Sequence, residues 1–260
     1  MIHIGTSGYS YEDWIGPFYP RGMRQADMLV YYAEHFGFTE INSTYYKMPN
    51  AAAMNNLQKK TPTDFVFTVK LHQSMTHDKN ATKQDYQSFA EAMSVLKQAG
   101  KLGCLVAQFP YSFHYNRENI DYLLRLKEKL PDFKLVVEFR NSKWLDPATF
   151  RFMGINELGY VCVDEPVLAG LPDQRGVATS KTAYIRFHGR NSEKWWDHQE
   201  AYERYDYLYS EEELLEWTDK IHRLQENTEH LFISFNNHFK AQAVANAQML
   251  RAILELSREI

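Results

Sequence analysis

CLVAQF at residues 104–109 and LVVEFR at residues 135–140 flank a stretch in which Ile120, Leu123 and Leu124 recur three and four positions apart. Short apolar runs are typical of buried strands, and the three-and-four spacing is typical of one face of a helix. A strand, a helix and a second strand in this order form a βαβ unit with parallel strands. This stretch therefore predicts an α/β fold.

The same alternation continues toward both ends of the chain, with helical spacing at residues 29–36, 89–96, 214–224 and 244–254. One connection differs, because residues 166–181 contain Gly170, Pro172 and Gly176 and show no helical period. We expect this connection to be irregular and to lack a helix. The strands are predicted at residues 2–7, 39–44, 65–71, 104–109, 135–140, 160–165, 183–188 and 231–236.

Eight βα units in 260 residues predict a single (β/α)8 TIM barrel that occupies residues 1–260. The alternative is an open doubly wound sheet. Central strands of such a sheet are covered on both faces and are continuously apolar, whereas most of these strands alternate with polar residues. The alternation favours the barrel.

Composition and charge narrow the class of protein. The formal net charge of -4 argues against the broad basic surface that non-specific DNA binding needs, which makes nucleic acid a secondary alternative as a partner. Cys104 and Cys162 lie in apolar runs, as expected of reduced core residues. Neither a signal-peptide pattern nor a long apolar segment is present, so we expect a cytoplasmic protein without a membrane partner. The sequence leaves the oligomeric state open.

The period of two along a strand separates the side chains that point into a barrel from those that face the helices. Placing the apolar set outward leaves a polar set inside. For the run 160–165 this rule puts Val161 and Val163 outward and Asp164 inward. The predicted inward side chains are His3, Gly5, Ser7, Glu40, Asn42, Thr44, Thr68, Lys70, Gln108, Glu138, Arg140, Asp164, Arg186, His188, Ser234, Asn236 and His238.

Two explanations fit so many polar groups at the strand ends. Barrel enzymes carry their catalytic groups at the carboxyl ends of the strands, which favours an active site. The alternative is a structural ion-pair network that plugs the barrel. In that network the acids Glu40, Glu138 and Asp164 would pair with Lys70, Arg140 and Arg186.

The leading hypothesis is an enzyme that uses acid/base catalysis, with Glu138, Asp164, His188 and Lys70 as catalytic residues. Either carboxylate would act as base or acid and His188 as a proton shuttle, while Lys70 or Arg186 would stabilise negative charge. Lys70 would also suit a Schiff base if burial and neighbouring cations suppressed its charge. A lone inward lysine is more often an ion-pair partner.

A metal-dependent isomerase or hydrolase is a further hypothesis, because Glu138, Asp164 and His188 are types of ligand that divalent metals take on this fold. The last strand offers Asn236 and Asn237 instead of a carboxylate, and three cations at the same rim would repel a divalent ion. We therefore predict no cofactor and keep a divalent metal as the less favoured alternative.

The loops after the last two strands favour an anionic or phosphorylated small molecule as ligand. In this fold these loops often bind phosphate through backbone N–H groups. Gly189 permits close backbone approach, and Arg190 is a bidentate donor. The predicted substrate-binding residues are Glu40, Asn42, Gln108, Arg140, Arg186, Gly189, Arg190, Asn236, Asn237, His238, Tyr9 and Trp14.

Aromatic residues concentrate in two segments that follow strands, residues 9–19 and residues 195–209. Both segments belong on the rim of the predicted barrel. They would stack on a sugar or a base, as in a non-catalytic or nucleic-acid-associated binding barrel. The alternative is that long rim loops need aromatic anchors in order to pack.

Several motifs in chain order resemble the YecE-like family, also described as domain of unknown function 72. The resemblance spans essentially the whole chain and implies a TIM barrel, but it implies no reaction, because the family has none established. The motifs are GTSGY at 5–9 with Trp14, Phe18, Tyr19 and Pro20; EINSTYY at 40–46; QFP at 108–110; VEFR at 137–140; RFHGR at 186–190; YDYLYS at 205–210; and FNNH at 235–238.

Overall fold

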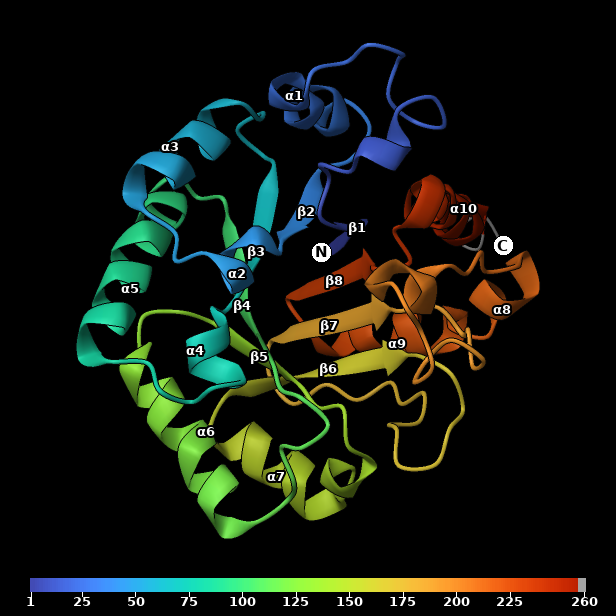
Figure 1. Cartoon of the computed structure of the whole chain (residues 1–260). Helices are drawn as coiled ribbons and strands as arrows, with labels where there is room; N and C mark the ends of the chain where they lie inside the picture. Colours follow the sequence, from blue (N-terminus) through green and yellow to red (C-terminus); the bar gives the residue numbers. More distant parts are fainter. Residues whose placement is uncertain (257–260) are drawn as a thin grey trace.

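Eight parallel strands close into one barrel in a computed structural model that describes residues 1–256. Each strand pairs with the next along the chain, and β8 returns to β1 (Figure 1). This confirms the predicted (β/α)8 fold and all eight predicted strands to within a few residues. The strands are β1 Ile2–Ser7, β2 Phe38–Ile41, β3 Val66–Lys70, β4 Leu102–Gln108, β5 Leu135–Glu138, β6 Leu158–Asp164, β7 Thr182–Phe187 and β8 His230–Phe235.

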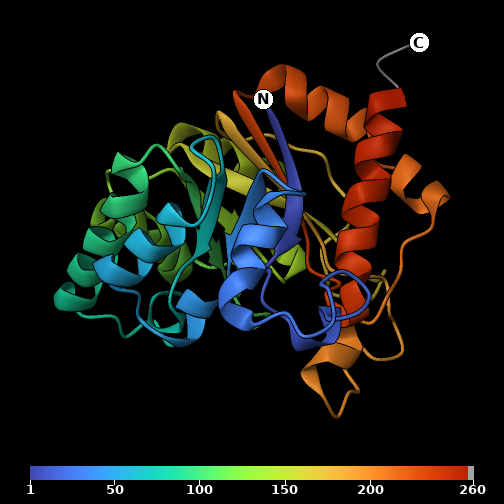
Figure 2. The same cartoon turned by 90° about the horizontal axis from the view of Figure 1, so that it is seen from above.

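Helices surround the barrel, and the long α10 lies beside β1 and β8 (Figure 2). Within residues 1–256, no helix has the length and apolar character needed to cross a membrane. The α-helices are α1 Met28–Ala33, α2 Ser43–Tyr46, α3 Ala51–Lys59, α4 Gln73–Thr76, α5 Lys83–Gln98, α6 Arg117–Lys129, α7 Pro147–Ile155, α8 Glu211–Leu215, α9 Thr218–Asn227 and α10 Gln242–Leu256, and the short 3-10 helices are Glu12–Trp14, Gln25–Asp27, Ser142–Trp144, Ala201–Tyr205 and Phe239–Ala241.

The connection between β6 and β7 is irregular, as predicted, and appears as a yellow loop in Figure 1. In place of a helix, Val177 and Ala178 pack against the core. The Cys162 thiol lies 3.5 Å from the backbone nitrogen of Val177, which ties this loop to the outer face of β6. The prediction of a missing helix is therefore confirmed.

The second strand is shorter than predicted. It ends at Ile41, because Asn42 takes a helical conformation and Ser43–Tyr46 form α2. Thr44, predicted to point inward from a strand, lies instead on that helix, where its hydroxyl donates to the Lys70 carbonyl at 2.6 Å. A serine and threonine after a strand end favour such a local turn.

The amino-terminal half of the barrel interior is apolar. His3 caps this layer and stacks on Phe232 with ring centroids 4.7 Å apart. The layer fills the barrel below the polar groups, so that those groups are confined to the carboxyl ends of the strands. Its other members are Phe38, Cys104, Val106, Val136, Val161, Val163 and Tyr184.

The predicted orientation of β6 is wrong. Val161 and Val163 point into the barrel, whereas Asp164 points outward. All seven residues of β6 are buried, and the outward Tyr160 and Cys162 belong to the core between strands and helices. Because both faces are apolar, the alternation in this strand contains no polar face that could set its direction.

Candidate functional site at the barrel rim

Glu138 at the end of β5 is the centre of the polar groups inside the rim. Its carboxylate lies 2.5 Å from Nε of Arg140, 2.6 Å from Nη1 of Arg186 and 3.3 Å from Nε2 of His188. The Glu138 side chain is fully buried. Burial alone would raise its pKa, but the two guanidinium groups and His188 hold the pKa of Glu138 well below its usual range.

Arg186 joins Glu138 to a carboxylate on the opposite side of the barrel. Its Nη2 lies 2.6 Å from Oε1 of Glu40, and the second oxygen of Glu40 accepts a hydrogen bond from the Tyr184 hydroxyl at 2.7 Å. These side chains are almost completely shielded from solvent. Because both arginine branches have a carboxylate partner, the positive charge of Arg186 is neutralised inside the protein.

Arg140 is shared between Glu138 and a third carboxylate, Glu165, whose Oε2 accepts from Nη1 at 2.9 Å. Three carboxylates thus face two guanidinium groups, and Oε1 of Glu165 has no hydrogen-bond partner in the described structure. Burial raises the pKa of Glu165 to about 8, with Arg140 opposing the shift and Glu138 adding to it. We call Glu40, Glu138, Arg140, Glu165 and Arg186 the arginine network.

Sequence reasoning missed Glu165. The signal was present, because Val161, Val163 and Glu165 occupy alternate positions and therefore share the inward direction of β6. The error in the orientation of this strand replaced Glu165 by its neighbour Asp164. The expected ion-pair network is present for Glu40, Glu138, Arg140 and Arg186.

His188 is fully buried between the arginine network and β8. The Asn236 amide nitrogen lies 3.1 Å from Nδ1, and Nε2 faces Glu138. Burial and the positive charge of Arg140 lower the pKa of His188 to about 3. The imidazole is therefore neutral at physiological pH and holds Glu138 in place by hydrogen bonding.

Lys70 at the end of β3 differs from the arginines because its charge has no carboxylate partner. Nζ donates to Oε1 of Gln108 at 2.8 Å and lies 4.2 Å from the ring centre of Tyr45. No acidic oxygen of residues 1–256 is within 4.0 Å of it. Burial, assisted by the charge of Arg186, lowers the pKa of Lys70 to about 7.

Two further side chains, His77 and Asn42, belong to the surroundings of Lys70. The His77 ring packs edge-on against Tyr45 at 4.9 Å, and burial together with Lys70 lowers the pKa of His77 to about 4. The carbonyl oxygen of the Asn42 side chain is buried without a hydrogen-bond partner in the described structure. His77 lies beyond the strand end, in the residue after α4, so strand alternation did not predict it. We call Lys70, Gln108, Tyr45, His77 and Asn42 the lysine corner.

Asp164 lies outside the barrel wall, between β6 and the helices. Its carboxylate accepts from Trp217 Nε1 at 2.7 Å and from the Tyr209 hydroxyl at 2.8 Å, and it forms two bonds to Arg190. The predicted metal ligands Glu138, Asp164 and His188 are therefore not brought together. Among residues 1–256, no group of three or more His, Cys, Asp or Glu side chains is arranged to hold a metal ion.

The loop after β7 already uses the donors predicted to bind an anion. The Gly189 N–H donates to the Tyr209 hydroxyl at 2.8 Å, and Arg190 pairs with Asp164 and, at 2.7 Å, with Glu216. Gly189 has a φ of +91°, and a Cβ there would lie 2.8 Å from Cβ of Tyr207, so glycine is needed for packing. In the next loop, the Asn237 amide donates to the Tyr207 carbonyl and to Asn246.

The aromatic rim segments contain both anchors and exposed rings. Trp14 is completely buried and donates from Nε1 to the His238 carbonyl at 2.6 Å. The carbonyl of Tyr9 accepts from the Tyr19 hydroxyl. By contrast, Trp196 is 54% exposed. These segments serve mainly to pack the rim loops, and they leave a minority of rings open to solvent.

Comparison with known proteins places this barrel in a family. The family described as "Protein of unknown function DUF72" matches residues 3–260. The chain belongs to the DUF72 family. This confirms the resemblance found in the sequence motifs, and the family description assigns no reaction.

Three relatives of this DUF72 protein align with nearly its whole length. The UPF0759 protein YunF of Bacillus subtilis (strain 168) is 28% identical over 98% of this chain and 95% of its own length. A crystal structure of a DUF72 family protein from Thermotoga maritima is 39% identical, with a TM-score of 0.91 over 98% of this chain and 99% of that one. A DUF72 family protein from Enterococcus faecalis is 25% identical, with a TM-score of 0.87 over 98% and 96% of the two chains.

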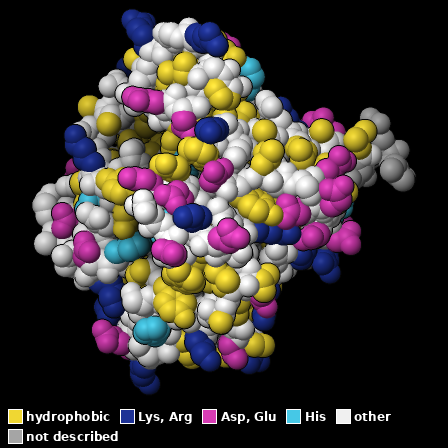
Figure 3. Space-filling model, turned by 45° about the vertical axis from the view of Figure 1, so that its right-hand side comes forward, with side chains coloured by type: hydrophobic (Ala, Val, Ile, Leu, Met, Phe, Trp, Pro, Cys, Tyr) yellow, Lys and Arg dark blue, Asp and Glu magenta, His cyan; other side chains and the backbone are white. Residues whose placement is uncertain are grey.

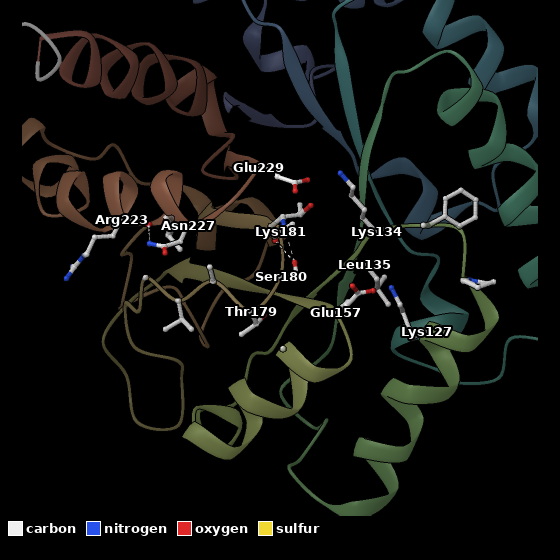
Figure 4. Close-up of a pocket in the computed structure, with 18 of the residues that line it drawn as sticks. Lys127, Lys134, Leu135, Glu157, Thr179, Ser180, Lys181, Arg223, Asn227 and Glu229 are labelled. Carbon is white, nitrogen blue, oxygen red and sulfur yellow. Dashed lines mark hydrogen bonds between the residues drawn. The ribbon is translucent and has the colours of Figure 1, made fainter.

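A large hollow of the DUF72 barrel lies at the opposite end from the rim (Figure 4). It has a volume of about 1010 Å³ and opens beside the first residues of β5 and β7, next to α9. Lys134, Lys181, Glu157 and Glu229 line it from different elements, with both signs of charge. Because catalytic groups of TIM barrels lie at the carboxyl ends of the strands, this hollow is separate from the candidate site.

The distribution of charged side chains on the surface is relevant to the alternative that this DUF72 protein binds nucleic acid. On the face shown in Figure 3, acidic and basic side chains are intermingled, with hydrophobic side chains between them. Surfaces that bind nucleic acid without sequence preference are predominantly basic, because they neutralise phosphates. This face does not have that character.

Proposed function

We propose that this DUF72 protein is an enzyme that acts on a small anionic molecule by proton transfer at the barrel rim, with Lys70 as the catalytic acid/base. The observation that carries the proposal is the unpaired, largely buried amine of Lys70, with a pKa of about 7. A proton-transfer group works best when its pKa is near the operating pH.

Two of the other inward groups, Glu138 and His188, suit a supporting role. The pKa of Glu138 is held well below its usual range and that of His188 falls to about 3, so neither group changes its charge near neutral pH. Glu138 instead fixes Arg140 and Arg186 through bonds of 2.5 and 2.6 Å. Positioned charges of this kind stabilise charge that develops on a substrate without having to move.

The electrostatics of the lysine corner support an anionic substrate. Burial lowers the pKa of Lys70 most, and repulsion from Arg186 and Arg140 adds to this lowering, while Glu138 and Glu40 oppose it. An anion next to Nζ would relieve that repulsion and favour the protonated amine. Binding of an anionic substrate should therefore be accompanied by proton uptake.

The first experiment measures the pKa of Lys70 by competitive labelling with acetic anhydride between pH 6 and 11, read by mass spectrometry of the Lys70 peptide. The exposed Lys129 in the last turn of α6 is the matched control. We expect a midpoint near 7 for Lys70, against about 10 for an ordinary lysine side chain. A midpoint near 10 for Lys70 would overturn the proposal.

A second experiment tests the anionic class by calorimetry at pH 7, with inorganic phosphate, pyruvate and fructose 6-phosphate as probes and fructose as the uncharged control. Titrations in two buffers of different ionisation enthalpy report proton uptake. We expect binding of at least one anion with proton uptake, which Lys70→Met abolishes and Lys129→Met retains. Unchanged binding by Lys70→Met, or binding of none of the anions, would count against the proposed substrate class.

A further inference from the structure

We propose that Lys70 acts as a nucleophile and forms a Schiff base with a small carbonyl compound that carries an anionic group, such as a 2-keto acid or a ketose phosphate. This inference rests on the proposed function, because it assigns a covalent step and a substrate class to the same amine. It goes beyond proton transfer, since it requires a free lone pair on Nζ and a carbonyl carbon within reach.

The hydrogen bonding around Nζ leaves that lone pair available. Gln108 is oriented by its own amide, which donates from Nε2 to the Phe109 carbonyl at 2.7 Å, and its Oε1 accepts from Nζ at 2.8 Å. The Tyr45 ring covers a second side of Nζ at 4.2 Å without offering a strong acceptor. A neutral amine held in this way donates one N–H to Gln108 and keeps its lone pair for a carbonyl carbon.

A second buried lysine shows the opposite arrangement. Nζ of Lys101 donates to the Gln58 carbonyl at 2.6 Å and to both the carbonyl and the hydroxyl of Thr61 at 2.8 and 3.0 Å. Three acceptors satisfy three ammonium hydrogens, as expected of a structural lysine. Lys70 has one such acceptor, so its surroundings stabilise the ammonium form far less.

The groups around Lys70 fit the remaining requirements of imine formation. Burial, with Arg186 and Arg140 adding to its effect and Glu138 and Glu40 opposing it, favours the neutral amine, and an anionic group of the substrate would offset the repulsion from the two guanidinium groups. The neutral His77 ring packs edge-on against Tyr45, so it adds no positive charge next to the amine.

The step balances without an oxidant or a reductant. The Nζ lone pair forms a bond to the carbonyl carbon, the π electrons move to oxygen, and one proton passes from nitrogen to that oxygen to give a carbinolamine. A proton from solvent then converts its hydroxyl to water, which leaves as the nitrogen electron pair forms the C=N bond, and the nitrogen returns its second proton to solvent. The products are an imine and one water molecule.

The experiment traps the imine in the intact protein at pH 7 with sodium cyanoborohydride, using pyruvate and dihydroxyacetone phosphate as probes. Hydroxyacetone is the uncharged control for the second probe, and peptide mass spectrometry locates the reduced adduct. We expect an adduct at Lys70 that forms roughly 100-fold or more faster than at Lys129, because a far larger fraction of Lys70 is neutral at this pH. Hydroxyacetone, which lacks the phosphate group, should react more slowly than dihydroxyacetone phosphate.

Variants separate the covalent step from the proposed function. Lys70→Met and Lys70→Arg should lose the adduct, and Lys101→Met, if it folds, should retain it. No adduct at Lys70 with either probe, combined with a labelling midpoint near 7, would overturn the Schiff base and leave the acid/base role standing. A midpoint near 10 would remove both.

Discussion

The arginine network and the lysine corner lie at the same rim but respond to burial in opposite ways. In the network, Arg140 and Arg186 pair with Glu138 and Glu40 at 2.5–2.6 Å, so that these charges remain although solvent is excluded. In the lysine corner, the nearest partners of Nζ are a neutral amide and an aromatic ring. The same burial therefore fixes charge in one region and makes it titratable in the other.

This contrast indicates different roles for the two regions. The network holds fixed charges that need no reorganisation during a reaction. Burial brings Lys70, which has no counter-ion, close to neutrality at physiological pH, and Arg186 adds to this lowering of its pKa. The network thus acts on the lysine corner through its field rather than through contact, and substitutions on either side can test this relation.

The largest effect is expected from Arg186→Met, which leaves Glu40 and Glu138 buried with fewer partners. Breaking a buried ion pair by removing one side costs about 3–5 kcal/mol. Urea unfolding at pH 7 should show a loss of this size in the free energy of unfolding. Arg24→Met is the control, because Arg24 pairs with Asp27 at the surface with a side chain 80% exposed, and should leave the free energy of unfolding nearly unchanged. Equal losses in the two variants would show that the buried ion pairs of Arg186 stabilise the protein no more than a surface ion pair does.

Glu165→Gln tests the carboxyl group of the network that shares its only guanidinium partner, Arg140, with Glu138. The pKa of Glu165 is raised to about 8 in the folded protein, so the native protein loses stability as pH rises from its unfolded value near 4.5 through 8. The variant cannot ionise and escapes this loss. We expect similar stability at pH 5 and an advantage for Glu165→Gln on the order of 2 kcal/mol at pH 9. A variant that is less stable than the native protein at pH 9 would show that Glu165 is ionised and paired.

Lys70→Met tests the pH dependence of stability that is expected for an amine with a lowered pKa. The pKa of Lys70 falls from 10.5 to about 7 on folding, so the native protein carries a cost that is absent above pH 10.5 and fully present below pH 7. We expect the variant to be more stable at pH 6 by on the order of 1–2 kcal/mol, since the amine is partly reached by water, and the difference to vanish toward pH 10. A loss of stability at pH 6 would mean that the ammonium is well accommodated.

Individual strands show which inward side chains could be predicted from the sequence. Glu138 and Arg186 were predicted to face inward because β5 and β7 alternate apolar and polar residues. In β6 both faces are apolar, and the same rule selected Asp164 in place of Glu165. Alternation therefore predicts direction only in strands that have one polar face.

The sequence pattern does not predict which charged side chains form ion pairs with one another. Glu40 and Arg186 are 146 positions apart and meet only because the barrel closes. Whether a given acid keeps its charge depends on distances: Glu138 touches two guanidinium groups, whereas Glu165 shares one of them. His77 belongs to the turn after a short helix, for which the period of a strand carries no information.

The smallest change, Gln108→Glu, would give the lysine corner the counter-ion that distinguishes the arginine network. The substitution keeps the shape of the side chain and places a carboxylate oxygen where an amide oxygen now lies 2.8 Å from Nζ. An opposite charge at this distance raises the pKa of an amine by about 1–3 units, so the labelling midpoint of Lys70 should move from near 7 to about 8 or above. Imine trapping at pH 7 should slow by about tenfold, because the neutral fraction of the amine falls by that factor. Gln108→Met removes the acceptor without adding charge and should leave the midpoint at 7 or lower it. If Gln108→Glu also left the midpoint unchanged, the low pKa of Lys70 would arise from burial alone, and the missing carboxylate would not be what separates the two regions.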